Sequence, residues 1–267
     1  MKLRRRFALL CALTAATVAS AAQPSGVADK ARVSFISAGG LRDGVYHAAI
    51  VIELAPDTTT YWRNPGEAGT PPTFDFAQST NFANADVSMP APTRIEEAGM
   101  DVFAYRTRVA FPVAIRPKDP AQPTRVDLKM DYAACEKICM PMHADAQLDL
   151  SPGAGPSAHA AAVADAEALV PKPIAAADAA TLKPVVGASK PSWTVAPHKP
   201  QAIDLFAEAP DGYFVETKKN ADGAFRLSVV EAPKGAPTPA APVRLTMTTA
   251  QGAVEFSVRL DAAPRAP

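Results

Sequence analysis

Cysteine is scarce in this sequence. Only Cys11, Cys135 and Cys139 occur among 267 residues. Cys11 lies in an apolar run near the N-terminus and follows Leu10 rather than a small residue, so we interpret it as part of a signal peptide and not as a lipidation site. The other two cysteines are too few for a disulfide-rich scaffold, and the fold is therefore expected to depend on apolar cores.

Apolar runs long enough to span a bilayer are also absent. The run from Phe7 to Val18 is too short, but it follows a basic segment and precedes small residues that end at Ala22, which is the order of a secretory signal peptide. We predict that residues 1–22 are a signal peptide cleaved near Ala22 and that the chain is exported to a bacterial periplasm. The mature chain is expected to be soluble, with no direct membrane insertion.

The sequence has no excess of basic residues. Its 27 Lys and Arg equal its 27 Asp and Glu, and loss of four basic residues with the signal peptide would leave 23 against 27, a net charge near −4. No glycine-rich phosphate loop follows any predicted strand. Nucleic-acid binding is therefore not expected.

Motifs of hydrolytic and zinc chemistry are missing as well. No G-x-S-x-G occurs, the acidic residues are scattered as on solvated faces, and no four ligands have the spacing of a zinc site. No cofactor is expected. The four histidines lie in contexts that indicate strand faces or linker: His47, His143, His159 and His198.

What the sequence does contain is a series of short strands separated by Gly and Pro, with no sustained helical period before residue 150. Together with a cysteine hairpin, about eight strands in some 120 residues are typical of an antiparallel sandwich. We predict one β-sandwich domain over residues 28–150. Its other strands are predicted at Arg32–Ile36, Val45–Leu54, Thr59–Trp62, Thr73–Phe76, Val87–Met89 and Val102–Ile115.

The strand pattern stops after residue 150 and resumes after residue 190. The stretch between, residues 151–190, is rich in Ala and Pro and is predicted to be a linker with one short helix near Ser157–Val170. Residues 191–262 are predicted to form a second, smaller β domain. Its strands are predicted at Trp193–Val195, Ile203–Glu208, Tyr213–Lys218, Phe225–Val230, Val243–Thr248 and Val254–Leu260.

Both cysteines of the mature chain lie in the stretch from Tyr132 to His143. Fully extended chain would place their Cα atoms about 13 Å apart, whereas a disulfide needs roughly 4.4–6.8 Å. Apolar and polar residues alternate on both sides, so the pair is expected at the tip of a hairpin. A disulfide that closes so small a loop stabilises by only about 2 kcal/mol, which suits reversible oxidation better than structural reinforcement.

The residues of this stretch leave three functions open. The first is a redox-active pair, favoured by the short loop, by Lys137 and His143 as possible thiolate partners, and by Pro141 at the turn exit, although Glu136 opposes a thiolate. The second is a small structural disulfide. The third is a Cu(I) site, since thiolate, thioether and imidazole suit that ion. Its ligands would be Cys135, Cys139, Met140, Met142 and His143.

A second distinctive stretch runs from Thr60 to Pro72 and combines aromatic residues with a Pro-Gly turn. It is either a strand that ends in a turn, with its aromatic residues in packing, or a cap that restricts access to the cysteine pair. The candidate cap residues are Tyr61, Trp62, Arg63 and Asn64.

Three motifs in this order resemble one family: Tyr61 to Gly69, Met89 to Arg94, and Cys135 to Pro141. The resemblance is to the periplasmic N-terminal region of DsbD-type and ScsB-type thiol:disulfide interchange proteins. It covers about residues 30–150 and extends more weakly through the second β domain. The spacing of the cysteines favours the ScsB-like branch, because DsbD-type domains usually have a longer gap.

The resemblance implies an immunoglobulin-like sandwich whose two cysteines, here Cys135 and Cys139, relay electrons from a membrane-embedded reductant to periplasmic thioredoxin-fold proteins. In related domains the more C-terminal cysteine is the usual exchanger, which would be Cys139. Because this sequence ends at Pro267 without a membrane part, its donor is expected to be a separate protein. The resemblance thus implies a protein-disulfide reductase-like role, with a copper-tolerance accessory protein or a non-catalytic β module as the alternatives.

Overall fold

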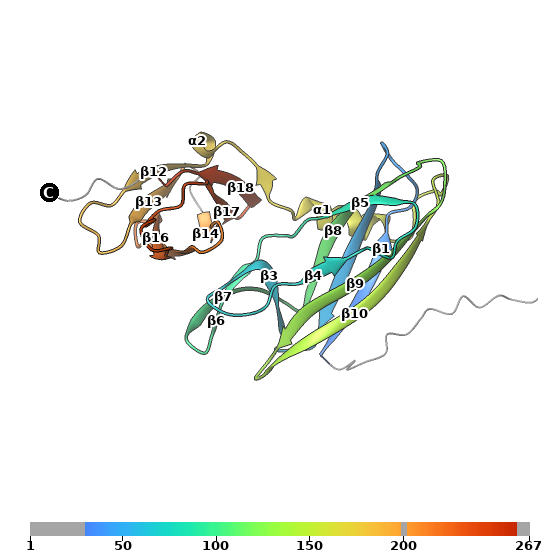
Figure 1. The fold of residues 1–267 in the computed structure, drawn as a ribbon, viewed down its shortest axis with the longest axis horizontal. Helices are drawn as coiled ribbons and strands as arrows, with labels where there is room; N and C mark the ends of the chain where they lie inside the picture. The colour runs from blue at the N-terminus through green and yellow to red at the C-terminus, as the bar shows by residue number, and fades with distance from the viewer. Residues whose placement is uncertain (1–29, 199–201, 261–267) are drawn as a thin grey trace, which may run out of the picture.

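The computed structural model describes residues 30–198 and 202–260, which form two β domains joined by a short helical segment (Figure 1). The predicted signal peptide lies outside the described residues. Within these ranges, no helix is long and apolar enough to cross a membrane. The predicted fold class, an immunoglobulin-like antiparallel sandwich followed by a smaller β domain, is confirmed.

The first domain consists of two antiparallel sheets. One has the strand order β1-β2-β8-β5, and the other has the order β10-β9-β3-β7-β6 with β4 paired to β9. The strands are β1 (Ala31–Ser37), β2 (Tyr46–Leu54), β3 (Thr59–Gly66), β4 (Thr73–Asp75), β5 (Phe82–Val87), β6 (Thr93–Glu97), β7 (Met100–Arg106), β8 (Arg108–Pro117), β9 (Thr124–Cys135) and β10 (Cys139–Leu150).

Alternation along the strands builds the core of this domain. In β9, every second residue from Val126 to Tyr132 is buried and the residues between them are more exposed. Successive side chains of a strand point to opposite faces of the sheet, so one face of β9 joins the core while the other faces outward. The buried face packs with β2 and β8 side chains such as Ile50 and Phe111.

Two strand predictions differ from the structure. Val102–Ile115 was expected as one strand, but Thr107 adopts a φ of +64° and separates β7 from β8, which lie in different sheets. A threonine in the left-handed region is uncommon, and an unbroken apolar run carries no sign of it. A strand was also expected at Val87–Met89, whereas β5 ends at Val87, and β6 was not predicted at all.

The segment 151–190, predicted as a linker, is mostly ordered into elements that pack on the two domains. It contains α1 (Ala160–Ala168), β11 (Lys172–Pro173), α2 (Ala176–Ala179) and β12 (Ala180–Pro184). Val163 and Ala166 of α1 pack against Ala49, Val51 and Ala110 on the outer face of the first sheet. The two short strands β11 and β12 join sheets of the second domain, so those sheets begin before residue 191.

The second domain has two four-stranded sheets, with orders β11-β18-β17-β14 and β12-β13-β16-β15. All its strand pairs are antiparallel except β11 with β18. Its core includes Trp193, Phe225 and Leu245. The remaining strands are β13 (Ser192–Pro197), β14 (Ala202–Glu208), β15 (Phe214–Lys219), β16 (Phe225–Glu231), β17 (Val243–Thr249) and β18 (Gly252–Val258).

Phe206 of β14 belongs to the apolar core of the first domain rather than that of the second. Its ring centroid lies 4.9 Å from that of Phe103 and 5.9 Å from that of Trp62, both in edge-on geometry. The second domain thus completes an aromatic cluster at the β3–β7 end of the first domain. Aromatic pairs in this geometry add to the stabilisation that burial of their area provides.

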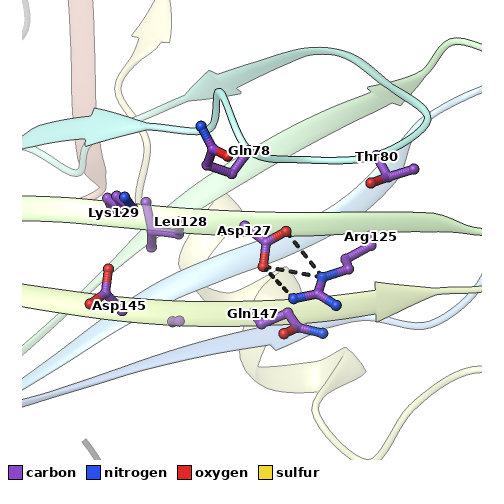
Figure 2. Close-up of a pocket in the computed structure, with 9 residues that line it drawn as sticks. Gln78, Thr80, Arg125, Asp127, Leu128, Lys129, Asp145 and Gln147 are labelled. Carbon is purple, nitrogen blue, oxygen red and sulfur yellow. Dashed lines mark hydrogen bonds and ion pairs between the residues drawn. The ribbon is translucent and has the colours of Figure 1, made fainter. Parts of the chain in front are cut away.

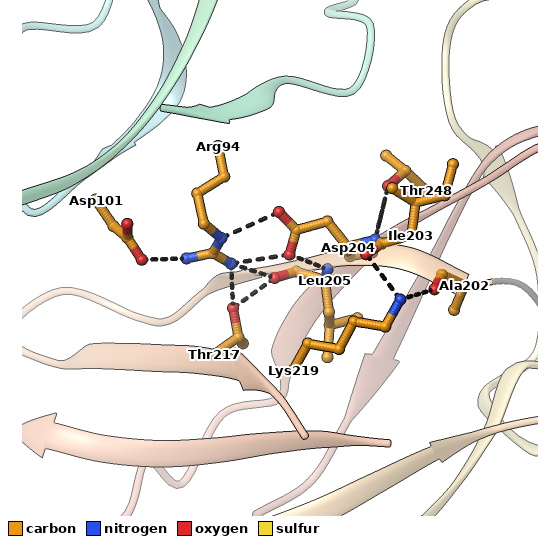
Figure 3. A network of polar contacts seen from close by, with 9 residues as sticks. All are labelled: Arg94, Asp101, Ala202, Ile203, Asp204, Leu205, Thr217, Lys219 and Thr248. Atoms are coloured by element: carbon orange, nitrogen blue, oxygen red, sulfur yellow. Dashed lines mark hydrogen bonds and ion pairs between the residues drawn. The ribbon is translucent and has the colours of Figure 1, made fainter. Parts of the chain in front are cut away.

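Two arginines of the first domain surround this cluster with ion pairs to the second. Arg63 donates hydrogen bonds to both carboxylate oxygens of Glu208, each at 2.7 Å. Arg94 does the same to Asp204, at 3.0 Å for each bond, and also donates to Asp101 at 2.9 Å (Figure 3). Bidentate arginine–carboxylate pairs constrain the orientation of both side chains in addition to pairing their charges, so these contacts hold the two domains in one relative orientation.

Candidate redox site

The β9–β10 hairpin presents the two cysteines at its tip. Cys135 ends β9 and Cys139 begins β10, and the two residues are register partners with Cα atoms 4.0 Å apart. They form a disulfide. The long alternating strands bring the cysteines together, because twelve register pairs align the hairpin from Thr124 and Leu150 up to its tip.

The two sulfurs lie in different environments. Cys135 is 2% exposed and packs with Tyr61 and Ala133, whereas Cys139 is exposed. The three residues between the cysteines are exposed too, and Ile138 at the tip has 78% of its surface accessible. A reagent or partner can therefore approach the bridge from the Cys139 side, while the Cys135 sulfur is enclosed by protein.

Tyr61 is the side chain that contacts the accessible sulfur. Its hydroxyl lies 3.5 Å from Cys139 Sγ and donates a hydrogen bond of 3.0 Å to Glu97 Oε2. Thr59 donates to the other oxygen of Glu97 at 2.8 Å. Burial, and secondly the charge of Glu97, raises the pKa of Tyr61 to about 12, so the phenol is neutral at physiological pH.

The turn after β3 covers the ring of Tyr61. Gly69 has a φ of +105°, and a Cβ added there would lie 2.5 Å from the ring atoms Cδ1 and Cε1 of Tyr61. Only glycine allows the backbone to approach the ring so closely. The Pro-Gly segment predicted as part of a cap therefore packs on the one cap residue that contacts a cysteine.

The other candidate cap residues lie at the interface with the second domain. Trp62 is fully buried and packs on Phe206. The guanidinium carbon of Arg63 lies 4.5 Å from the centre of the Trp62 ring. Asn64 donates a 2.6 Å hydrogen bond to the carbonyl oxygen of Ala207. Tyr61 and Trp62 are separated in this way because neighbouring residues of a strand point to opposite faces.

Glu97 and Thr59 were not predicted as site residues. Thr59 Oγ1 lies 3.2 Å from the carbonyl oxygen of Cys135, and the two residues are register partners. Glu97 ends β6, a strand that was not predicted, and reaches the site across β7 and β3. Their proximity to the cysteines follows from strand order, for which no signal exists in the local sequence.

The five candidate copper ligands do not converge. Met142 is buried in the core and Met140 packs against it, on the hairpin face opposite the disulfide. His143 is exposed and pairs with Asp131 at 2.9 Å and with Asp145 at 3.3 Å. The hydrogen bond to Asp131 raises the pKa of His143. A Cu(I) site would need both thioethers to leave the core and the imidazole to leave its carboxylates.

Two hollows lie along the hairpin. A shallow one of about 320 Å³ adjoins the site and is lined by the 70–73 loop together with Asp131, Pro141 and His143. A larger polar one, of about 520 Å³, is lined by residues that include Arg125, Asp127 and Lys129 (Figure 2). Cys135 lies ten positions after Arg125 along β9, about 33 Å of strand, so the Arg125 end of the larger hollow is remote from the disulfide.

The fold and the site define a β-sandwich that presents a disulfide, with one accessible and one buried sulfur, on a hairpin tip. Residues 28–151 match the family described as thiol:disulfide interchange protein DsbD, N-terminal. The predicted resemblance to DsbD-type and ScsB-type domains is thereby confirmed for this part of the chain.

A structural relative extends across both domains. The N-terminal periplasmic domain of ScsB from Proteus mirabilis is similar with a TM-score of 0.70 at 17% identity, over 88% of this chain and 94% of that chain. At this identity the likeness establishes a shared fold. The Neisseria meningitidis DsbD N-terminal domain in the reduced form matches with a TM-score of 0.27 at 15% identity, over 47% of this chain and 86% of that one. No curated protein sequence matches the chain.

Proposed function

We propose that this protein is a periplasmic thiol-disulfide exchange protein whose Cys135–Cys139 pair cycles between disulfide and dithiol. The observation that carries the proposal is the asymmetry of the bridge: Cys139 is exposed at a hairpin tip and Cys135 is buried. The match of residues 28–151 to the DsbD N-terminal family supports the same chemistry.

Reduction would begin at the exposed sulfur. A thiolate of a dithiol donor attacks Cys139 Sγ, the Cys135 sulfur leaves as a thiolate and takes up a proton, and a mixed disulfide with the donor forms. The second donor thiolate then displaces Cys139. The donor is left as a disulfide, and this protein holds two electrons and two protons as a dithiol.

Delivery of the electrons would reverse these roles. The Cys139 thiolate attacks the disulfide of an acceptor, and the Cys135 thiolate then attacks Cys139 Sγ and releases the reduced acceptor. Cys139 is the exchanging cysteine and Cys135 the resolving one. Family resemblance indicates a separate membrane-embedded reductant as donor and periplasmic thioredoxin-fold proteins as acceptors.

Trapping of the mixed disulfide tests this assignment. In the full mature chain, Cys135→Ser removes the resolving thiol, so Cys139 should form a persistent mixed disulfide with a thioredoxin-fold protein that lacks its own resolving cysteine. Cys139→Ser should trap far less, because the remaining sulfur is buried. Equal trapping by both variants would contradict the assignment of roles, and no trapping by either would reject the exchange function.

A further inference from the structure

The hydrogen bonds around Tyr61 place an acidic residue next to the exchanging sulfur. We propose that Glu97, acting through Tyr61, keeps Cys139 in the protonated thiol form when the pair is reduced, and so restrains its nucleophilicity. Glu97 is thus a positioning residue for the exchange reaction. The inference rests on the proposed function, for it concerns the same cysteine pair.

A tyrosine hydroxyl has one proton to donate, and here Tyr61 donates it to the Glu97 carboxylate at 3.0 Å. The phenol oxygen, 3.5 Å from Cys139 Sγ, then offers a lone pair to that sulfur. A thiol can donate its S–H to this lone pair, whereas a thiolate would find no donor there. The bond to Glu97 therefore favours the thiol.

Charge acts in the same direction. The Glu97 carboxylate and a Cys139 thiolate would be two anions on either side of one hydroxyl group, and a nearby like charge disfavours the ionised form. Thr59 adds a second donor to Glu97 at 2.8 Å, which fixes the carboxylate in this position. The Tyr61 side chain between the two groups is buried and its contacts with Glu97 and Cys139 are part-buried, so solvent screens the interaction only in part.

The other charged groups near the tip provide little opposition. Glu136 forms an ion pair with Lys30, and the two charges offset each other. Lys137 is exposed in the turn. His143 is held by Asp131 and Asp145 four register pairs away from the disulfide. Among the described residues, Glu97 is the charged group connected by hydrogen bonds to the hydroxyl that contacts Cys139.

The rate of alkylation of Cys139 by iodoacetamide tests the inference, measured against pH in the full mature chain carrying Cys135→Ser. Glu97→Gln removes the charge with little change of shape and frees the Tyr61 proton for the sulfur. We expect its alkylation midpoint to move to lower pH and its rate at pH 7 to rise several-fold. Glu96→Gln is the matched control, because Glu96 is an exposed neighbour on the same strand, and it should leave both unchanged.

A double variant separates the hydrogen bond from the charge. If the Tyr61 hydroxyl transmits the effect, Tyr61→Phe combined with Glu97→Gln should lose most of the gain that Glu97→Gln shows alone. A Glu97→Gln midpoint that stays in place or moves to higher pH would overturn the inference, provided that thermal unfolding shows an intact fold. The alkylation measurement needs no partner protein, so it is independent of the trapping experiment. If trapping fails but Glu97→Gln still shifts the alkylation midpoint to lower pH, the exchange function is rejected and the role of Glu97 stands.

Discussion

Phe206 and Phe103 come from different domains, yet their ring centroids lie 4.9 Å apart inside one apolar core. Phe206 is fully buried there, and Trp62 packs on it from β3. The same strand β3 carries Tyr61, which contacts Cys139. The second domain therefore packs directly behind the strand that lines the redox site, and it contributes Phe206 to the first domain's core.

The first prediction concerns this aromatic contact. Phe206→Ala should destabilise the protein by about 3–5 kcal/mol, as large-to-small substitutions of buried phenylalanines do. Denaturant-induced unfolding measures the loss. Ile203→Ala on the same strand is the control, since Ile203 is 58% exposed, and it should change the free energy of unfolding by less than about 0.5 kcal/mol. Equal effects of the two substitutions would show that Phe206 is not part of a cooperative core.

The second prediction concerns the ion pair between Arg94 and Asp204. A double-mutant cycle with Arg94→Gln and Asp204→Asn should give a coupling free energy of about 1–2 kcal/mol, because the pair is bidentate and each side chain is 21% exposed. The Arg125–Asp127 pair is the control. Its arginine is 53% exposed, so solvent screens the pair and its coupling should be clearly smaller than that of Arg94 with Asp204. A coupling no larger than that of the control would mean that the interface does not depend on this pair.

The contrast between Tyr61 and Glu97 shows what the sequence could predict. Local alternation identifies strands and the cysteine hairpin, since a period of two is a property of neighbouring residues. Tyr61 was a candidate cap residue only because of the aromatic and Pro-Gly composition around it, and alternation does not bring it to the cysteines. Glu97 is 38 residues from Thr59 and meets it only because β6, β7 and β3 are adjacent in one sheet. Strand order of this kind depends on tertiary packing, which periodicity does not encode.

The interface was beyond prediction for the same reason. The pattern of Ile203–Glu208 indicated a strand correctly, but nothing in it distinguishes Phe206, which packs into the other domain, from Leu205, which packs into its own. The two residues point to opposite faces of β14. Arg63 and Asn64 were candidate cap residues as part of the aromatic and Pro-Gly stretch, and in the structure they contact the second domain.

The third prediction concerns access to the cysteine pair, which we propose is restricted by Tyr61 and the turn that covers it. Tyr61→Ala should speed alkylation of the reduced pair by a small reagent, because it uncovers Cys135 and removes the side chain that contacts Cys139. Tyr61→Phe keeps the ring and should retain the shielding. Trp62→Ala should act mainly on stability, since Trp62 packs on Phe206. Tyr61→Ala with unchanged alkylation rates and an intact fold would contradict the shielding role.

The last prediction separates a redox pair from a structural bridge. The twelve register pairs of the hairpin align Cys135 with Cys139, so the strands should stay paired without the bond. The five-residue loop that the bond closes contributes only about 2 kcal/mol. We therefore expect the Cys135→Ser, Cys139→Ser double variant, and the reduced wild-type chain, to keep the β-sheet circular dichroism spectrum and to melt only modestly below the oxidised protein.

Replacing the exposed Ile138 with Ser controls for changes at the tip that leave the bond intact, and it should not alter the melting temperature. If reduction unfolded the first domain, or if strongly reducing dithiols left the bond intact in the folded protein, the cysteines would form a structural bridge and the exchange cycle would be excluded.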